Sequence, residues 1–545
     1  MYDFIIVGAG SAGCVLANRL SLDPAISVCL VEAGPRDSSP IVHVPLGLIG
    51  MMHSKKMNWR YYTEQEPALQ GRKLFWPRGK TLGGSSSSNA MCYIRGHATD
   101  YDEWESLGNK GWSYVDVLPY FKKSESQERG SSPYHGTDGP LNVADLRIRN
   151  PLSDAFIRAA KQAGHRLTQD FNGDQQEGVG YYQVTQKNGQ RCSSAVAYLR
   201  PAEERPNLTV ITDALTTKVL LEDKKAVGIE YKKDDQLHTI HAKKEVILSG
   251  GAINSPQILM LSGIGERSEL ESAGIEVKHH LPGVGKNLQD HLDALVVTRE
   301  RTFHSVGFSP VALLRSIKGL VDYILFRKGN FTTNIAEAGG FAKTKSDLEK
   351  SDVQFHFSPC FLDNHGLNLL QTVRHGYSLH ACNLRPSSRG SLTIGSRDPA
   401  VPPVITANYL SDPADIQVMV KGIKLSREIL KQSAFDHYRG VEVFPGKQVQ
   451  TDEALASFIR EKAESIYHPV GTCKMGSDEQ AVVDDKLKVH GISGLRVVDA
   501  SIMPTLIGGN TNAPTIMIGE KASDLILTDI KNKNKSELEL NNCAA

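Results

Sequence analysis

The chain has 545 residues, and its balance of 40% hydrophobic and 23% charged side chains is typical of a globular enzyme. At about 100–200 residues per domain, this length predicts two or three domains. The 62 basic side chains are matched by 61 acidic ones, so no overall electrostatic field draws the protein to nucleic acid. Composition therefore disfavours nucleic-acid binding as a function.

The eight cysteines stand singly along the chain, and no two of them form a C-x-x-C pair. Such spacing does not make a disulfide framework and favours a reducing compartment. The first apolar run begins at Tyr2 and lacks the basic start and the small-residue cleavage site of a secretory signal. No stretch reaches the roughly 18 uninterrupted apolar residues of a membrane-spanning helix. We expect a cytoplasmic protein, and peripheral attachment to a membrane stays open.

The first 33 residues predict a buried strand, a glycine turn, an amphipathic helix and a second strand. Gly8, Gly10 and Gly13 have the G-x-G-x-x-G spacing of a Rossmann fingerprint. In that motif they permit a tight turn, close approach of the backbone to a pyrophosphate, and packing of helix on sheet. Glu32 follows the second strand, where an acid accepts hydrogen bonds from an adenosine ribose. The pattern predicts a bound dinucleotide, and a glycine-rich turn without a ligand is the alternative.

An acid at this position argues against a 2′-phosphate and leaves NAD or FAD. A second glycine-rich stretch, Gly79–Met91, reads GKTLGGSSSSNAM. Trp76 and Pro77 precede it and apolar residues follow it, so we expect it to enter the interior rather than to form a solvent loop. Small residues there would let the backbone lie against a flat ring system.

Four segments, spread over nearly the whole chain, resemble the glucose-methanol-choline (GMC) family of FAD-dependent oxidoreductases, in its choline dehydrogenase-like and alcohol dehydrogenase branch. They are the fingerprint with Glu32, the Gly79–Met91 loop running on to Gly96, the stretch Gly251–Gly265, and the run from His468 to Lys521. The resemblance implies an α/β fold with a Rossmann-like FAD-binding domain. A substrate domain with a mostly antiparallel sheet covered by helices would complete it.

The FAD-binding domain is predicted to be discontinuous, over residues 1–155, 200–295 and 470–530, so that both chain ends build one site. Residues 156–199 and 296–469 would form the substrate-binding domain. Residues 531–545 are polar and are predicted to be disordered.

Residues Pro310–Lys328 predict an amphipathic helix. We expect its apolar face to pack in a core or at a domain interface. Docking on a membrane surface is the alternative.

The resemblance assigns FAD binding to Gly8, Gly10, Ser11, Ala12, Gly13, Glu32, Ala33, Trp59, Gly83, Gly84, Ser85, Asn89, Ala90, Met91, Val219, Asp499, Ala500, Asn510, Asn512 and Ala513. Ser88 stands where some choline-oxidising relatives carry a histidine joined covalently to the flavin. Because serine cannot form that link, we expect FAD to be bound non-covalently.

Within this set, the resemblance places Asn89 and Ala90 beside the flavin ring. Asp499 and Ala500 would lie near the pyrophosphate and the ribityl chain. Val219 would offer its backbone to the adenine.

The stretch Ile466–Gly476 reads IYHPVGTCKMG and holds His468 five residues ahead of Cys473. Spacing alone fits a zinc half-site, a cysteine nucleophile with its base, or a packed turn. No other histidine or cysteine lies within ligand spacing, and a cysteine hydrolase would leave the dinucleotide unexplained. We expect no metal and a structural Cys473. The resemblance instead implies that His468 faces the flavin as a base with Asn510 as its partner, and Asn512 is the alternative partner.

The resemblance further places Glu337, His356 and Tyr467 near the substrate, although a lone acid or histidine on a strand is as often structural. Ile335 and Ala336 stand where choline oxidases carry tryptophans. This departure disfavours choline, which needs an aromatic cage, and favours an uncharged primary alcohol.

The sequence thus predicts FAD-dependent oxidation of a primary alcohol to its aldehyde, with electrons passed to a quinone or another acceptor. An oxidase that uses oxygen is the near alternative, and a flavin-containing hydroxynitrile lyase is an alternative of another class. A non-catalytic binding protein is the least favoured, since His468 and Asn510 would then have no role. The sequence leaves the particular alcohol and the oligomeric state open.

Overall fold

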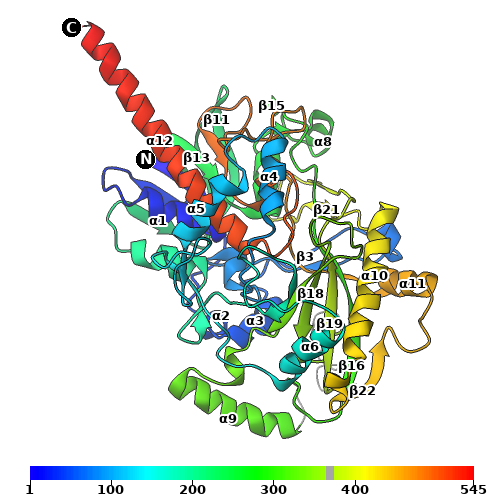
Figure 1. The fold of residues 1–545 in the computed structure, drawn as a ribbon. Coiled ribbons are helices and arrows are strands. Elements are labelled where there is room, and N and C mark those ends of the chain that lie inside the picture. Colours follow the sequence, from blue (N-terminus) through cyan, green and yellow to red (C-terminus); the bar gives the residue numbers. More distant parts are fainter. Residues whose placement is uncertain (308–309, 364–373, 545) are drawn as a thin grey trace.

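The computed structural model describes residues 1–307, 310–363 and 374–544, with side chains described except at 310–316, 533–534 and 536–544. Within these residues, two seven-stranded sheets carry the architecture, and smaller two-stranded sheets join them. Figure 1 shows the helices that cover the sheets.

The first sheet has the Rossmann-like arrangement. Its strand order is β10 (Leu208–Ile211), β2 (Val28–Val31), β1 (Tyr2–Val7), β13 (Gln236–Leu248), β12 (Lys225–Lys233) and β11 (Leu215–Glu222), and β24 (Leu495–Val497) pairs with β13. The strands β10, β2, β1, β13 and β24 run parallel, whereas β11 and β12 form an antiparallel extension. The α/β class and the first two predicted strands are confirmed.

The two ends of the chain meet on this sheet. Helix α1 (Ser11–Leu20) lies against α12 (Asn512–Ala544), as the red and blue helices of Figure 1 show. Arg19 on α1 donates two hydrogen bonds, of 2.9 and 2.6 Å, to the fully buried carboxylate of Glu520 on α12. A buried Arg–carboxylate pair of this kind fixes the position of one helix on the other.

The second sheet is antiparallel, as predicted. Its strand order is β22 (Arg439–Phe444), β16 (Leu292–Glu300), β19 (Gly376–Asn383), β18 (Val353–Ser358), β17 (Ala338–Ala342) and β7 (Gly178–Tyr181), and β23 (Glu464–Ser465) pairs with β16. Helices α6 (Pro151–Gln162) and α10 (Pro413–Leu430) contact its strands. Every residue of β18 and β19 is buried, because helices cover one face and the rest of the protein covers the other.

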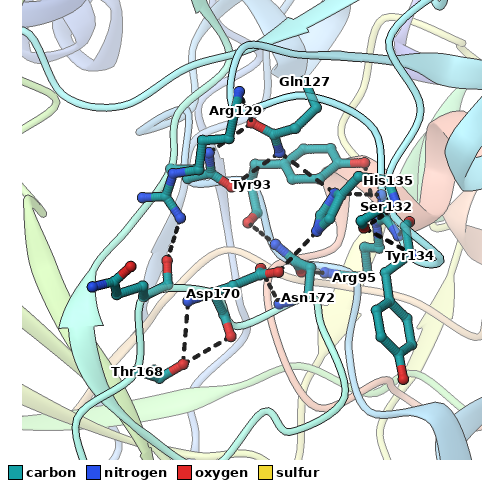
Figure 2. A network of polar contacts seen from close by, with 12 residues as sticks. Tyr93, Arg95, Gln127, Arg129, Ser132, Tyr134, His135, Thr168, Asp170 and Asn172 are labelled. Carbon is teal, nitrogen blue, oxygen red and sulfur yellow. Dashed lines mark hydrogen bonds and ion pairs between the residues drawn. The ribbon is translucent and has the colours of Figure 1, made fainter.

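A polar network that is buried at Arg95, Glu125 and His135 ties distant segments together (Figure 2). The guanidinium of Arg95 contacts Glu125 Oε1 at 2.5 Å, and His135 bridges Glu125 and Asp170 at 2.9 Å each. Burial raises the pKa of Glu125, but the hydrogen bond from His135 and the charge of Arg95 outweigh it, so this pKa lies below its ordinary value. Burial lowers the pKa of His135, but its two carboxylate partners leave that pKa raised. The network crosses the predicted domain boundary at residue 155.

Helix α9 (Pro310–Phe326) corrects one prediction. The apolar face that we expected to pack in a core or an interface is exposed over its described part, with Ile324 61% and Leu325 64% accessible. Helix α12 continues as far as Ala544 and so includes residues 531–544, for which disorder was predicted. In the described part of the chain, no helix is long and apolar enough to cross a membrane.

Candidate active site

A cavity of about 390 Å³ lies between the two sheets and receives segments from nearly the whole chain. Of the residues predicted to bind FAD, those that line it are Gly8, Gly10, Ser11, Ala12, Glu32, Ala33, Trp59, Gly84, Ser85, Asn89, Ala90, Met91, Asp499, Ala500, Asn510 and Asn512. His356, Tyr467, His468 and Ser88 line the same cavity. Residues from both ends of the sequence therefore face one space.

One end of the cavity is formed by the glycine turn between β1 and α1. Gly8 has φ +98°, and a Cβ on it would lie 2.5 Å from the carbonyl oxygen of Ser249, so only glycine fits. Helix α1 begins without a side-chain cap and without an acid in its first turn. Its free N–H groups and positive dipole end are therefore available to an anion such as a pyrophosphate.

The second glycine-rich loop lies directly on the first. A Cβ on Gly84 (φ +52°) would be 2.9 Å from the Cα of Gly10. Ser11 Oγ donates a 2.8 Å hydrogen bond to Asn512 Oδ1, which joins the start of α1 to the start of α12. These contacts assemble one backbone cradle from three parts of the chain.

Glu32 stands at the end of β2 beside this cradle. Its two carboxylate oxygens accept hydrogen bonds from the N–H groups of Ala9 (2.9 Å) and Gly34 (2.8 Å). Burial raises the pKa of Glu32 to about 7, and these N–H groups and Lys80 oppose the rise. A carboxyl group held in this way is suited to accept hydrogen bonds from ribose hydroxyl groups.

The catalytic prediction centres on His468 and Asn510, whose side chains meet on the cavity wall. Asn510 Nδ2 lies 3.2 Å from His468 Nε2, and Gln354 Nε2 donates to Asn510 Oδ1 at 3.1 Å. Because the amide oxygen is engaged by Gln354, the amide N–H points at the imidazole. Asn512, the alternative partner, instead accepts the hydrogen bond of Ser11.

A second imidazole stands behind His468. His291 Nε2 lies 3.3 Å from the carbonyl oxygen of Leu384, and His291 Nδ1 lies 3.0 Å from His468 Nδ1. A carbonyl only accepts, so the His291 proton sits on Nε2 and its Nδ1 accepts from His468 Nδ1–H. This relay leaves the lone pair of His468 on Nε2, where it accepts from the Asn510 N–H on the cavity wall.

Both imidazoles are kept neutral by their surroundings. Burial is the largest cause that holds the pKa of His468 well below its usual value, and the neighbouring His291, His356 and Arg78 lower it further. Burial and the charge of Arg385 lower the pKa of His291 to about 3. His468 is therefore an unprotonated acceptor at neutral pH.

The backbone at His468 is clamped in an uncommon conformation. Tyr467 has φ +69°, in the left-handed region that costs a bulky residue about 1 kcal/mol or more. Arg78 Nη1 donates to the Tyr467 carbonyl at 2.7 Å, and the His468 N–H donates to Asp290 Oδ1 at 2.6 Å. Burial raises the pKa of Asp290 to about 6, against the hydrogen bonds of Ser465 and Tyr409. Arg78 and the buried Asp290 thus hold the strained peptide that aims the imidazole.

Four residues of the predicted FAD set do not line the cavity: Gly13, Gly83, Val219 and Ala513. Gly13 has the packing role predicted for it, since its Cβ would lie 1.9 Å from the Gly8 carbonyl oxygen. Val219 is buried, and its N–H donates to Ser262 Oγ at 2.8 Å. Residues 214–216, earlier in the same segment, line the cavity instead. The alternation of β11 could have indicated Thr216 rather than Val219.

Glu337 also lies away from the cavity, although it was expected near the substrate. Its carboxylate accepts from the Asn150 N–H (2.8 Å), Ser153 Oγ (2.9 Å) and Thr333 Oγ1 (2.8 Å). Each oxygen is engaged, so Glu337 joins the start of α6 to the segment before β17. The structure assigns it a packing role.

The sequence did not single out the residues behind His468. His291 and Asp290 follow Gln289 directly before β16, and an adjacent acid and histidine at the start of a buried strand was the available signal. His380 lines the cavity and contacts Asp293 Oδ2 at 2.5 Å. Cys473 is buried, with its pKa raised by burial, and among the described residues no group of three His, Cys, Asp or Glu is placed to hold a metal.

The parallel sheet with its glycine cradle, and the histidine–amide pair in the same cavity, define the class of FAD-dependent oxidoreductases. The chain belongs to the GMC oxidoreductase family, whose profile matches residues 2–293 and 386–519. FAD fits the residues present, because α1 is uncapped at the cradle, a Cβ on Gly8 or Gly84 would clash, and Glu32 stands at the ribose position.

Curated relatives are similar over nearly the full length. The chain is 51% identical to the alcohol dehydrogenase [acceptor] of Pseudomonas putida over 97% of this chain and 96% of that protein. It is 48% identical to the mitochondrial choline dehydrogenase of Homo sapiens over 96% of this chain and 89% of that protein. Among solved structures, pyridoxine 4-oxidase from Mesorbium loti superposes with a TM-score of 0.87 at 29% identity, covering 96% of this chain and 99% of that one. The chain is thus a homologue of enzymes that act on CH–OH donors.

Proposed function

We propose that the protein oxidises an uncharged primary alcohol to its aldehyde, with His468 as the proton acceptor, and passes the electrons to a quinone or another acceptor. The observation that carries the proposal is the pairing of His468 with Asn510 on the cavity wall, where the unprotonated Nε2 accepts from the amide N–H. The dinucleotide cradle opens into that same cavity. FAD would be bound non-covalently, since Ser88 offers no imidazole for a covalent link.

Alcohol oxidation removes a hydride from carbon and a proton from oxygen. Bound FAD supplies the hydride acceptor. When substrate binds, the Asn510 N–H donates to the substrate oxygen in place of His468 Nε2 and holds that oxygen beside the base. His468 Nε2 is then free to take the hydroxyl proton. His291 accepts from His468 Nδ1–H throughout, so the ring keeps its orientation while Nε2 becomes protonated.

The charges of the cavity support an uncharged substrate. Among the described residues that line it, the carboxylates are Glu32 and Asp499, and Asp499 already accepts from Gly251, Ser255 and Ser501. Near His468 the cavity has instead the guanidinium of Arg78. The Lys80 ammonium also lies over the Trp59 ring, with Nζ 4.5 Å from the ring centre. A quaternary ammonium would therefore find repulsion rather than a counter-ion.

The compartment and the acceptor belong to the same proposal. The seven described cysteines are buried and unpaired, which supports a reducing compartment. We favour a quinone or another organic acceptor over oxygen, and a comparison of turnover with a redox dye and with oxygen separates the two.

The test is anaerobic mixing of the purified flavoprotein with linear alcohols, aromatic alcohols and choline. Bleaching of the oxidised flavin absorbance by an uncharged primary alcohol is the expected result. Faster bleaching by choline would overturn the substrate class. No bleaching with any alcohol would overturn the reaction and would favour a lyase.

A matched pair of variants tests the base. His468→Ala should bind FAD normally and reduce flavin about 10²–10⁴-fold more slowly, which is the usual value of a positioned base. His437→Ala, which removes an exposed imidazole that does not line the cavity, should leave the rate unchanged. Near-full turnover by His468→Ala would show that another group takes the proton.

A further inference from the structure

Helix α9 presents apolar side chains to solvent at helical spacing. Ile317, Leu320, Val321, Ile324 and Leu325 are 56%, 44%, 48%, 61% and 64% exposed, and Phe326 follows at 62%. The spacings i, i+3, i+4, i+7 and i+8 place the first five on one face. We call these six residues the α9 stripe. Six of the sixteen large exposed hydrophobic side chains in the described part of the chain lie in this short segment.

The other face of α9 holds the helix on the protein. Gly319 and Tyr323 are buried, and the Tyr323 ring packs against Phe331 with ring centres 6.1 Å apart. The helix is therefore held on the protein by its opposite face, and the stripe stays exposed while α9 is packed in place. Figure 1 shows α9 at the margin of the molecule, away from both sheets.

Basic side chains flank the stripe. Lys318, Arg327 and Lys328 are exposed, and Arg147 joins them by donating a 3.3 Å hydrogen bond to the Arg327 carbonyl. Asp322 is the acid in the described part of the helix, and it lies on the side next to Gly329, where α9 leads back to the body. An apolar stripe with a basic flank complements a surface that is apolar inside and anionic at its rim.

Both ends of α9 lead into walls of the cavity. Val306 and Gly307, before the helix, and Asn334, Ile335 and Ala336, after it, line that cavity. The turn at Asn330–Thr332 contacts both α9 and the turn at Pro45–Gly47, which precedes the cavity-lining helix α3 (Leu48–His53). A partner bound to the stripe would therefore lie close to the segments that line the cavity.

We propose that the α9 stripe docks on the surface of a lipid bilayer with anionic headgroups. The helix would lie in the plane of the interface, its stripe among the acyl chains and its basic side chains at the headgroups. A second copy of the chain fits less well, because a two-fold contact through the stripe would bring the basic flanks of both copies together. The proposal rests on α9 and does not depend on the proposed alcohol oxidation.

The test is flotation of the full-length, FAD-loaded protein with vesicles of phosphatidylcholine, with and without phosphatidylglycerol. We expect co-flotation with the anionic vesicles and weaker binding at high salt. The double variant Ile324→Asp with Leu325→Asp should lose about tenfold or more of this binding, because two charges would enter the interface. Lys318→Glu with Arg327→Glu should lose binding to anionic vesicles only.

The matched control is Leu237→Asp with Val441→Asp, which places the same charges on side chains that are 64% and 57% exposed outside α9. This control should float like the wild type. Flavin absorbance and melting temperature should agree in all variants. Wild-type protein that floats with neither vesicle would overturn the proposal, as would an aspartate double variant that floats normally. Dimers that become monomers in that variant, without vesicle binding, would assign the stripe to a second copy.

Discussion

His468 owes its protonation state first to burial and then to the second imidazole behind it. Its pKa is held below the ordinary value of about 6.5, so the lone pair on Nε2 is present throughout the neutral range. A base with a depressed pKa becomes protonated, and so loses activity, only when the pH falls below that depressed value. Flavin reduction should therefore stay constant from neutral pH down past about 6.5.

Substitution of His291 tests the relay between the two imidazoles. His291→Asn removes one of the groups that lower the pKa of His468, so this pKa should rise and the acid limb of flavin reduction should move to higher pH. Stopped-flow reduction over a range of pH measures the shift. A variant that is slower by the same factor at every pH would indicate a merely structural His291.

Gly84 offers a test of the glycine cradle. Gly84→Ala would place a methyl group 2.9 Å from the Gly10 Cα, so the loops must separate and FAD affinity should fall at least about tenfold. Gly71→Ala is the matched control, because Gly71 also has positive φ (+73°) but has open space around its Cβ. The control should cost only the left-handed backbone strain of about 1–2 kcal/mol. Flavin release on dilution measures the difference, and equal flavin retention would contradict it.

The contact between helix α6 and the segment before β17 depends on the buried carboxylate of Glu337. Glu337→Gln leaves at least one of its three donors without an acceptor, which should cost about 1–3 kcal/mol of the free energy of unfolding. Alcohol KM should not change, since Glu337 is not on the cavity wall. Exposed Glu479→Gln is the control and should change neither. A changed KM with an unchanged melting temperature would return Glu337 to the substrate site.

The sequence predicted best those helices and strands whose formation depends on residues close to them in the chain. The glycine spacing and the apolar runs around it suffice to predict β1, α1 and β2, because turn sterics and burial act within thirty residues. Helix α9 was predicted as a helix but with the wrong environment. Periodicity shows that one face is apolar and does not show what covers it. The polar composition of 531–544 likewise hides a helix that simply extends α12.

In the molecule as a whole, the network of Figure 2 makes the stability of the contact between distant segments dependent on pH. The pKa of His135 is raised by its carboxylate partners against burial, so its stabilisation is fully present below about pH 6.5 and is lost as the pH rises through the folded-state value. The difference in melting temperature between the wild type and His135→Gln should be large near pH 6 and should shrink toward pH 9. A difference that grows with pH would contradict this account.

The candidate site was only partly accessible from sequence because its contacts are long-range. His468 and Asn510 could be predicted from the family resemblance, whereas His291 meets His468 across 177 positions and has no local mark of its role. Val219 and Glu337 carried plausible roles that depend on which way a strand faces. The pairing of a strand with its neighbours in the sheet decides which face each side chain occupies, and the spacing of residues in the sequence does not show that pairing.

The hydrogen bond between Ser11 and Asn512 joins residues 501 positions apart and closes the cradle. During translation, the fingerprint is made some 500 residues before Asn512. Until the segment with Asn512 has been made, the fingerprint side of the cradle lacks the partner that closes it. Capture of the flavin in a complete cradle must therefore follow the synthesis of that segment.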